Sequence, residues 1–154
     1  MKIALDTEFN GFGGQLISIA LVPETLEDIF YEVLPCDNPE SWVAKNVIPV
    51  LNQEPIHSEF SLAKSVLQHR LQNWLKRIKL QTDNDIEIIA NWPDDVRYFC
   101  ELLITGPGYM IATPNRMTFT MDRSLPEISK HSKIPHNARE DAISLMRHII
   151  NTTP

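Results

Sequence analysis

Near the start of the chain, apolar residues gather in three stretches that have the length of β-strands, and polar turn residues separate these stretches. Residues 2–9 (KIALDTEF), 15–22 (QLISIALV) and 28–34 (DIFYEVL) are rich in β-branched, aromatic and other apolar side chains. A glycine-rich turn follows the first stretch, and Pro23 and Pro35 end the other two. Because the connections are short, the pattern predicts three strands that pair as an antiparallel meander.

Apolar residues recur at spacings of three and four further along the chain, which predicts helices. The strongest repeat covers residues 61–78, and the last covers residues 137–151. Residues 39–51 and 94–103 carry shorter repeats, and a capping pattern indicates one more short helix at residues 124–130.

Two further strands are predicted among these helices. Residues 86–90 (IEIIA) form a short apolar run, and residues 109–112 are interpreted as a fifth strand, whereas residues 113–121 have no clear pattern. The resulting order, β-β-β-α-α-β-α-β-α-α, predicts an α/β fold with a mixed five-stranded β-sheet flanked by α-helices. With no repeat or linker in the sequence, residues 1–154 are expected to form a single domain.

Charge and cysteine content narrow the functional classes. Lysine and arginine number 14 and acidic residues 20, which gives a net charge of -6 and disfavours broad neutralisation of duplex phosphates. No apolar run approaches the roughly 18 residues that span a bilayer, and Asp6 comes too early for a signal peptide. The two cysteines, Cys36 and Cys100, are far apart in sequence. We therefore expect a cytoplasmic protein without a membrane partner.

Asp6 and Glu8 are the first candidates for chemistry. They lie two residues apart on a predicted strand, so both carboxylates point to the same face. Adjacent acids repel each other unless a cation lies between them, and ligation by oxygen alone suits Mg²⁺ or Mn²⁺. Taken alone, such a pair is more typical of a solvated strand edge.

Two later stretches carry acids next to predicted helix starts. Asp94 and Asp95 follow a buried strand, where either could also be a simple N-cap. His136 precedes the last predicted helix, and Asp141 lies on that helix. Neither stretch is specific by itself, since helical surface acids and loop histidines are common.

The combination of these stretches is far more specific. Residues 5–9 (LDTEF), 91–95 (NWPDD) and 136–142 (HNAREDA) lie at the start, middle and end of the chain. In this order they resemble the DEDDh branch of the 3′–5′ exonuclease superfamily. The short chain and the DTEF opening are most similar to its compact mycobacterial-type exoribonuclease group. The resemblance implies a ribonuclease H-like fold, with metal ligands at Asp6, Glu8, Asp95 and Asp141.

The middle motif departs from the family pattern. In the family, the metal-binding aspartate stands four positions after an asparagine, and counting from Asn91 selects Asp95. A phenylalanine usually precedes that aspartate, whereas this chain has Asp94 there. Asp95 is therefore favoured as the ligand, with Asp94 left as the helix cap, and the choice between the two stays open.

The resemblance also implies a mechanism, in which two Mg²⁺ or Mn²⁺ ions support phosphodiester hydrolysis. His136 would act as the general base that takes a proton from the attacking water, since imidazole titrates near neutral pH. Thr7, Phe9 and Asn10 would contact the terminal nucleotide. Phe9 lies on the strand face opposite Glu8, so core packing is an equal alternative for its side chain.

The expected substrate is the 3′ end of single-stranded or short-overhang RNA, from which nucleoside 5′-monophosphates are released. Exonuclease action on single-stranded DNA ends is the alternative, followed by a catalytically silent nucleic-acid-binding relative. Relatives often form homodimers, so a second copy of the chain is another expected partner. Residues 116–123 could be a lid, a dimer contact or a plain loop. Trp42 and Trp74 fit helical apolar patterns and are predicted to lie in the core.

Overall fold

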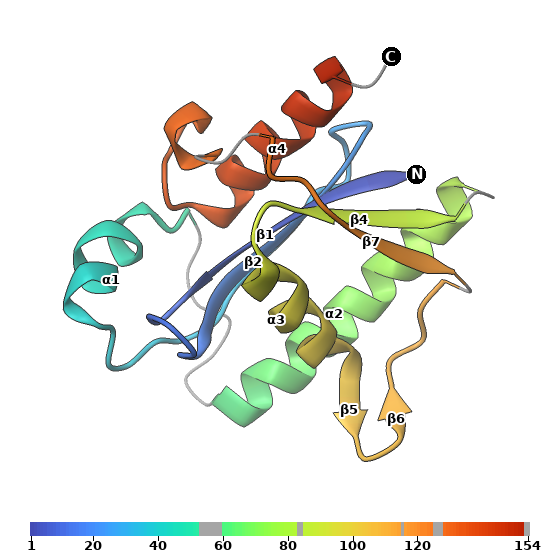
Figure 1. The fold of residues 1–154 in the computed structure, drawn as a ribbon. Coiled ribbons are helices and arrows are strands. Elements are labelled where there is room, and N and C mark those ends of the chain that lie inside the picture. Colours follow the sequence, from blue (N-terminus) through green and yellow to red (C-terminus); the bar gives the residue numbers. More distant parts are fainter. Residues whose placement is uncertain (53–59, 83–84, 115, 125–127, 153–154) are drawn as a thin grey trace.

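Three antiparallel strands open the chain as predicted. The computed structural model describes residues 1–52, 60–82, 85–114, 116–124 and 128–152 (Figure 1). Strand β1 (Lys2–Phe9) pairs with β2 (Leu16–Pro23), and β2 pairs with β3 (Phe30–Val33). The β1–β2 register shifts between Glu8 and Phe9, so β1 carries an irregularity where its acidic residues lie.

Two parallel strands complete the sheet on the other side of β1. Strand β4 (Ile86–Ala90) pairs with β1, and β7 (Met117–Met121) pairs with β4. The five-stranded sheet has the order β3-β2-β1-β4-β7. The remaining elements are α1 (Ser41–Asn46), η1 (Ile48–Val50), α2 (Phe60–Gln81), α3 (Pro93–Leu103), β5 (Ile104–Gly106), β6 (Tyr109–Met110), η2 (Ile128–His131) and α4 (Ala138–Thr152).

Helices cover both faces of the sheet (Figure 1). Alternate residues of β1 point in opposite directions, so Ile3 and Leu5 pack with α2 and α3, while Ala4 packs with α4. Strand β2 is buried along its whole length, which explains its nearly continuous apolar sequence. This confirms an α/β architecture with a mixed five-stranded sheet.

The identity of the fifth strand was predicted wrongly. Residues 109–112 do not join the main sheet, because Tyr109–Met110 turns back after Pro107 and Gly108 and pairs with β5 in a two-stranded hairpin. The fifth strand is instead Met117–Met121, from the stretch that showed no pattern. The residues of β7 are largely exposed, so its sequence lacks the alternation of apolar and polar residues that a half-buried strand shows.

The helix predictions are confirmed with changes at the ends. The predicted helix at residues 39–51 is split into α1 and η1, because Pro49 has no N–H to continue the hydrogen-bond ladder. Of the predicted helix at residues 124–130, residues 125–127 lie outside the described ones, and a single 3₁₀ turn covers Ile128–His131. No described helix combines the length and the apolar character that crossing a membrane requires.

Candidate metal centre

Three carboxylates meet at one end of β1. Asp6 and Glu8 project from the face of β1 that α4 covers, and Asp141 lies in the first turn of α4. Their oxygens lie within 4.8 Å of one another. The three side chains line a cleft of about 470 Å³. The carboxyl end of β4, Ala90, pairs with Leu5 next to Asp6, and the carboxyl ends of parallel strands are the usual place for a ligand site in α/β arrangements.

The first turn of α4 is fixed by Asn137. Its side-chain Oδ1 accepts a hydrogen bond from the Glu140 N–H (3.1 Å), as an N-cap does. Its Nδ2 donates to the Val50 carbonyl (2.7 Å), which ties the helix start to the segment after α1. Because Asp141 follows one turn later, this anchored cap sets where its carboxylate lies.

Asp95 is the aspartate of the middle stretch that faces the cleft. Its Oδ1 accepts hydrogen bonds from the backbone N–H (3.1 Å) and the hydroxyl (2.7 Å) of Thr7, and the side chain is buried. Asp94 instead accepts a hydrogen bond from Trp92 Nε1 (3.0 Å) and pairs with Arg97 (3.3 Å). The prediction that Asp94 caps α3 is wrong, because Trp92 holds the N-cap position and Asp94 lies within the first turn.

Crowding and burial disfavour the ionised form of every acid in the cleft. Burial, helped by the charges of Asp95, Glu8 and Asp141, holds the pKa of Asp6 well above its usual range. Burial, followed by the charges of Asp141 and Asp95, raises the pKa of Glu8 to about 8. Burial also raises the pKa of Asp95 to about 7, against the lowering effect of the Thr7 hydrogen bonds. The pKa of Asp141 rises to about 6, again chiefly through burial.

The donor set fits divalent cations that prefer oxygen ligands. Asp6 Oδ2 and Asp141 Oδ1 are buried and accept no hydrogen bond from the described residues. Buried carboxylate oxygens normally find a donor, so these two point to a cation as the missing partner. Asp6, Glu8 and Asp141 would be the ligands, with Asp95 beside them, and all four supply oxygens of the kind that Mg²⁺ and Mn²⁺ prefer.

Thr7 is expected to tune this centre through Asp95. In Thr7→Val the shape of the side chain is kept but the hydroxyl donor to Asp95 is lost, so Mn²⁺ affinity should fall about 10-fold. Thr7→Ser keeps the donor and is the matched control. Isothermal titration calorimetry with Mn²⁺ measures both. Equal affinity in the two variants would contradict a role for this hydrogen bond.

His136 lines the same cleft. Its backbone N–H donates to Asp141 Oδ2 (3.2 Å), and its φ of 63° lies in the left-handed region, which non-glycine residues rarely adopt. This conformation bends the chain back over the start of α4. It brings a histidine five residues before Asp141 to the side of the carboxylates.

The residues predicted to contact substrate divide into two groups. Thr7 and Phe9 line the cleft. Phe9 is also partly buried against Tyr98, with ring centroids 5.1 Å apart, which supports the packing interpretation, whereas its contact with substrate stays a prediction. Asn10 is not among the lining residues: its side chain bonds the Asn38 carbonyl (2.9 Å) and the Glu40 N–H (2.7 Å), which fixes the neighbouring loop.

Several aromatic and basic side chains near the cleft escaped the sequence analysis. Trp42 was predicted to lie in the core, but it is 55% exposed and packs edge to face with His136 (4.9 Å), whereas Trp74 is buried as predicted. The guanidinium of Arg123 lies 4.8 Å from the Trp92 ring, and Lys130 lines the cleft. The helical pattern around Trp42 does not say whether its ring faces the core or the cleft, and no pattern marks Arg123 or Lys130, since tertiary contacts alone bring α1 and η2 to the site.

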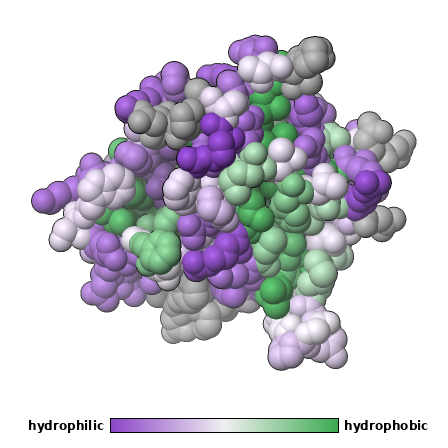
Figure 2. All heavy atoms as spheres, viewed as in Figure 1, coloured by the Kyte–Doolittle hydropathy of each residue, from purple (hydrophilic) through white to green (hydrophobic). Residues whose placement is uncertain are grey.

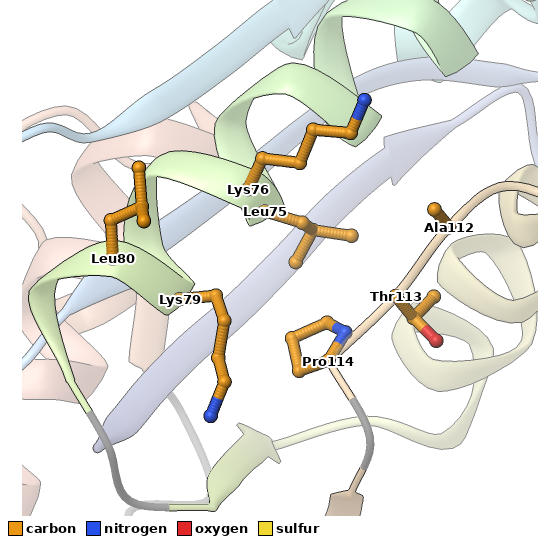
Figure 3. A pocket seen from close by; sticks show the side chains of 7 residues that line it. All are labelled: Leu75, Lys76, Lys79, Leu80, Ala112, Thr113 and Pro114. Atoms are coloured by element: carbon orange, nitrogen blue, oxygen red, sulfur yellow. The ribbon is translucent and has the colours of Figure 1, made fainter.

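A second cavity, of about 410 Å³, lies away from the carboxylates, between the end of α2 and the segment after β6 (Figure 3). Leu75 and Pro114 contribute apolar surface to it, and Lys76 and Lys79 contribute the charged groups. Its lining holds no carboxylate and no histidine, so it has none of the residues predicted for chemistry.

Comparisons with known proteins found no match, so the evidence on function comes from the geometry of the site. No family model matches the chain, and no curated protein resembles it closely enough in sequence to count as a relative.

Proposed function

We propose that this protein is a metal-dependent 3′–5′ exonuclease with a preference for RNA. The observation that carries the proposal is the meeting of Asp6, Glu8 and Asp141 within 4.8 Å in an open cleft, with Asp95 beside them. These residues come from the start, middle and end of the chain. They are the four acids that the resemblance to the DEDDh exonucleases assigns as metal ligands in the three stretches.

The fold supports the same family. A mixed five-stranded sheet with helices on both faces is the architecture of a ribonuclease H-like domain. The first acidic pair lies at the end of a central strand, and the last aspartate lies on the terminal helix. His136 precedes that helix and lines the cleft, where a general base would be needed.

The chain's own residues would bind and orient the terminal phosphodiester. When bound to the carboxylates, two divalent cations would offset the negative charge of the phosphate and of the attacking and leaving oxygens. His136 would accept the proton of the water that adds to phosphorus. The bond from phosphorus to the 3′ oxygen then breaks, which leaves a nucleoside 5′-monophosphate and a shortened strand with a free 3′ hydroxyl.

The surroundings of the cleft suit a single-stranded end. Phe9 and Trp92 offer aromatic surface, on which a base can stack with an energy of about 1–3 kcal/mol regardless of its identity. Lys130 adds a cation against the net acidic charge of the protein. The preference for RNA rests on the resemblance to the compact exoribonucleases, since recognition of RNA depends on contacts to the 2′-hydroxyl.

A time course on 5′-labelled RNA and DNA of equal sequence tests this function. With Mn²⁺ we expect a ladder that shortens from the 3′ end, faster on RNA, and no products in EDTA. A faster reaction on DNA would reassign the substrate to single-stranded DNA ends. No cleavage of either strand with any divalent cation would instead favour a catalytically silent binding protein.

The two neighbouring aspartates provide a matched pair for the same assay. Asp95→Asn should lower kcat/KM by about 10³-fold, because a metal ligand worth several kcal/mol in the transition state is lost. Asp94→Asn removes an equal charge one residue away, where the side chain faces Trp92 and Arg97, and should stay within about threefold of wild type. The reverse ranking would assign the ligand to Asp94.

A further inference from the structure

The cavity between the end of α2 and the segment after β6 is a fixed feature of the fold (Figure 3). Its two walls are tied together, because Gln72 Oε1 on α2 accepts a hydrogen bond from the Ala112 N–H (3.0 Å). The preceding residue, Ile111, is buried in the core and donates its N–H to the Leu103 carbonyl (2.9 Å). The segment therefore cannot close onto the helix without breaking these contacts, and the space of about 410 Å³ is formed before any ligand binds.

Aliphatic side chains make up most of the lining of this cavity. Leu75 extends from α2 towards the opposite wall, where Ala112 and Pro114 lie (Figure 3). Leu75 itself is buried, but Leu80 in the last turn of the helix is 88% exposed. A leucine left in water forgoes the stabilisation that burial would contribute, so a ligand that covers Leu80 would gain it.

Two lysines place positive charge beside this apolar surface. The side chains of Lys76 and Lys79 diverge on either side of Leu75 (Figure 3), and neither ammonium group forms an ion pair or hydrogen bond with the described residues. Arg70 and Arg77 of the same helix, by contrast, each pair with an acid. In a chain with a net charge of -6, two cations without an acidic partner at an apolar cavity indicate a ligand that is both apolar and anionic.

We propose that this cavity binds a small organic anion, an apolar chain that carries a carboxylate or a phosphate at one end. The chain would lie on Leu75, Leu80 and Pro114, and the anionic head would pair with Lys76 or Lys79. Lysine is a compact point charge on a flexible stem, so it accepts either head group without requiring a bidentate geometry. Sites for small molecules commonly combine a cavity of about 300–1,000 Å³ with an apolar lining and a few polar groups that fix the orientation of the ligand.

The lining disfavours a nucleic-acid strand as the occupant. None of the seven residues that line the cavity is aromatic, so a base would find no ring on which to stack. Two lysines would also neutralise few phosphates of a longer strand. The cavity shares no lining residue with the cleft that holds the carboxylates, so the inference does not depend on the proposed catalytic function.

Titration with decanoate below its micelle concentration, followed by ¹H–¹⁵N NMR spectra, is the first test. We expect saturable shifts of the Ala112 and Thr113 amides, which lie in the wall of the cavity. Affinity should rise about fourfold for each methylene added from hexanoate to decanoate, because each one buries further apolar surface. Decyl phosphate then distinguishes the two head groups, and decylammonium, with the same chain and the opposite charge, should not bind.

Apolar surface elsewhere on the molecule provides the contrast. Apolar side chains gather on the side where β7 and the β5–β6 hairpin lie (Figure 2), and Ile104 and Met110 of the hairpin are exposed. A ligand held by its chain alone would shift the amides of these residues as much as those of the cavity. Such shifts, or equal binding of decylammonium and decanoate, would overturn the proposal, and so would the absence of saturable binding.

Charge-neutral variants test the role of the lysines. Lys76→Gln combined with Lys79→Gln keeps two long polar side chains and should lower decanoate affinity at least about 10-fold. Each single variant should lose less, because the other ammonium can still receive the head group. Lys45→Gln, on α1 and outside the lining, is the matched control and should bind as wild type does. Unchanged affinity in the double variant would contradict the pairing.

Leu80 allows a second comparison that does not disturb the core. Because this side chain is 88% exposed, Leu80→Glu and Leu80→Lys should both fold, which circular dichroism checks. Both variants lose the same apolar surface, but only the glutamate competes with the ligand for the lysines, so decanoate should bind Leu80→Lys at least about 10-fold more tightly. Equal affinities would count against charge recognition, and displacement of decanoate by single-stranded RNA at equal concentration would assign the lysines to nucleic acid instead.

Discussion

Asp6→Asn is expected to abolish cleavage of nucleic-acid ends and, in buffer without divalent cations, to raise the melting temperature. Asp6 is held among three other acids, and its pKa is raised well above the usual range by burial and by those charges. The neutral amide relieves that repulsion, so Tm should rise by about 5 °C. The same change removes a ligand oxygen, so kcat/KM should fall about 10³-fold.

A gain in stability combined with a loss of activity is the signature of a site built for charge that the fold alone disfavours. Differential scanning calorimetry in EDTA and the nuclease assay in Mn²⁺ provide the two readouts. Glu24→Gln, which removes an exposed acid far from the cleft, should change neither. A lower Tm for Asp6→Asn would mean that the carboxylate is structural, and the metal centre would then lose its main support.

The stability of the cation-free protein should fall as pH rises from about 5 to 8. The cleft acids titrate near pH 4 in the unfolded chain, but the pKa is about 6 for Asp141, about 7 for Asp95 and about 8 for Glu8 in the folded protein. The folded state therefore holds more protons through this range. Raising the pH removes them and lowers the free energy of unfolding, by about 1.4 kcal/mol per pH unit for each extra proton that the folded state holds.

Divalent cations should reverse this dependence. Mg²⁺ or Mn²⁺ binds the deprotonated carboxylates, so binding strengthens as pH rises and offsets the repulsion between them. Urea unfolding at pH 5, 6, 7 and 8, with EDTA or with Mn²⁺, measures both curves. Glu8→Gln should flatten the EDTA curve, because the acid with a pKa of about 8 is gone. A flat curve for wild type in EDTA would show that the pKa values of the cleft acids are not raised in the folded protein.

Much of the fold could be predicted because helices and strands that bury one face or both show a recognisable spacing of apolar residues in the sequence. Strand β4 is largely buried and helix α3 buries one apolar face, and the bounds of both match the prediction to within a residue. Strand β7 could not be predicted, since its residues are exposed and only pairing with β4 makes it a strand. Pro49 was visible in the sequence, so the break between α1 and the 3₁₀ turn at Ile48–Val50 could have been predicted from its missing N–H.

The candidate site likewise has features that follow from the sequence and features that depend on tertiary contacts. That Asp6 and Glu8 share a face follows from strand geometry alone, and the sequence determined it. Which of Asp94 and Asp95 faces the cleft was decided only when the parallel pairing of β1 with β4 placed Thr7 beside Asp95, where Thr7 donates hydrogen bonds to that carboxylate.

Local chemistry thus determined which residues carry charge, which segments are apolar and which turns end them. Only the tertiary structure decided that Asp141 lies close enough to Glu8 to raise the pKa of Glu8, and that Trp42 packs on His136. It also decided that an uncharged strand forms the edge of the sheet. The physical reason is that these effects depend on distances between residues remote in the chain, and no sequence period encodes such distances.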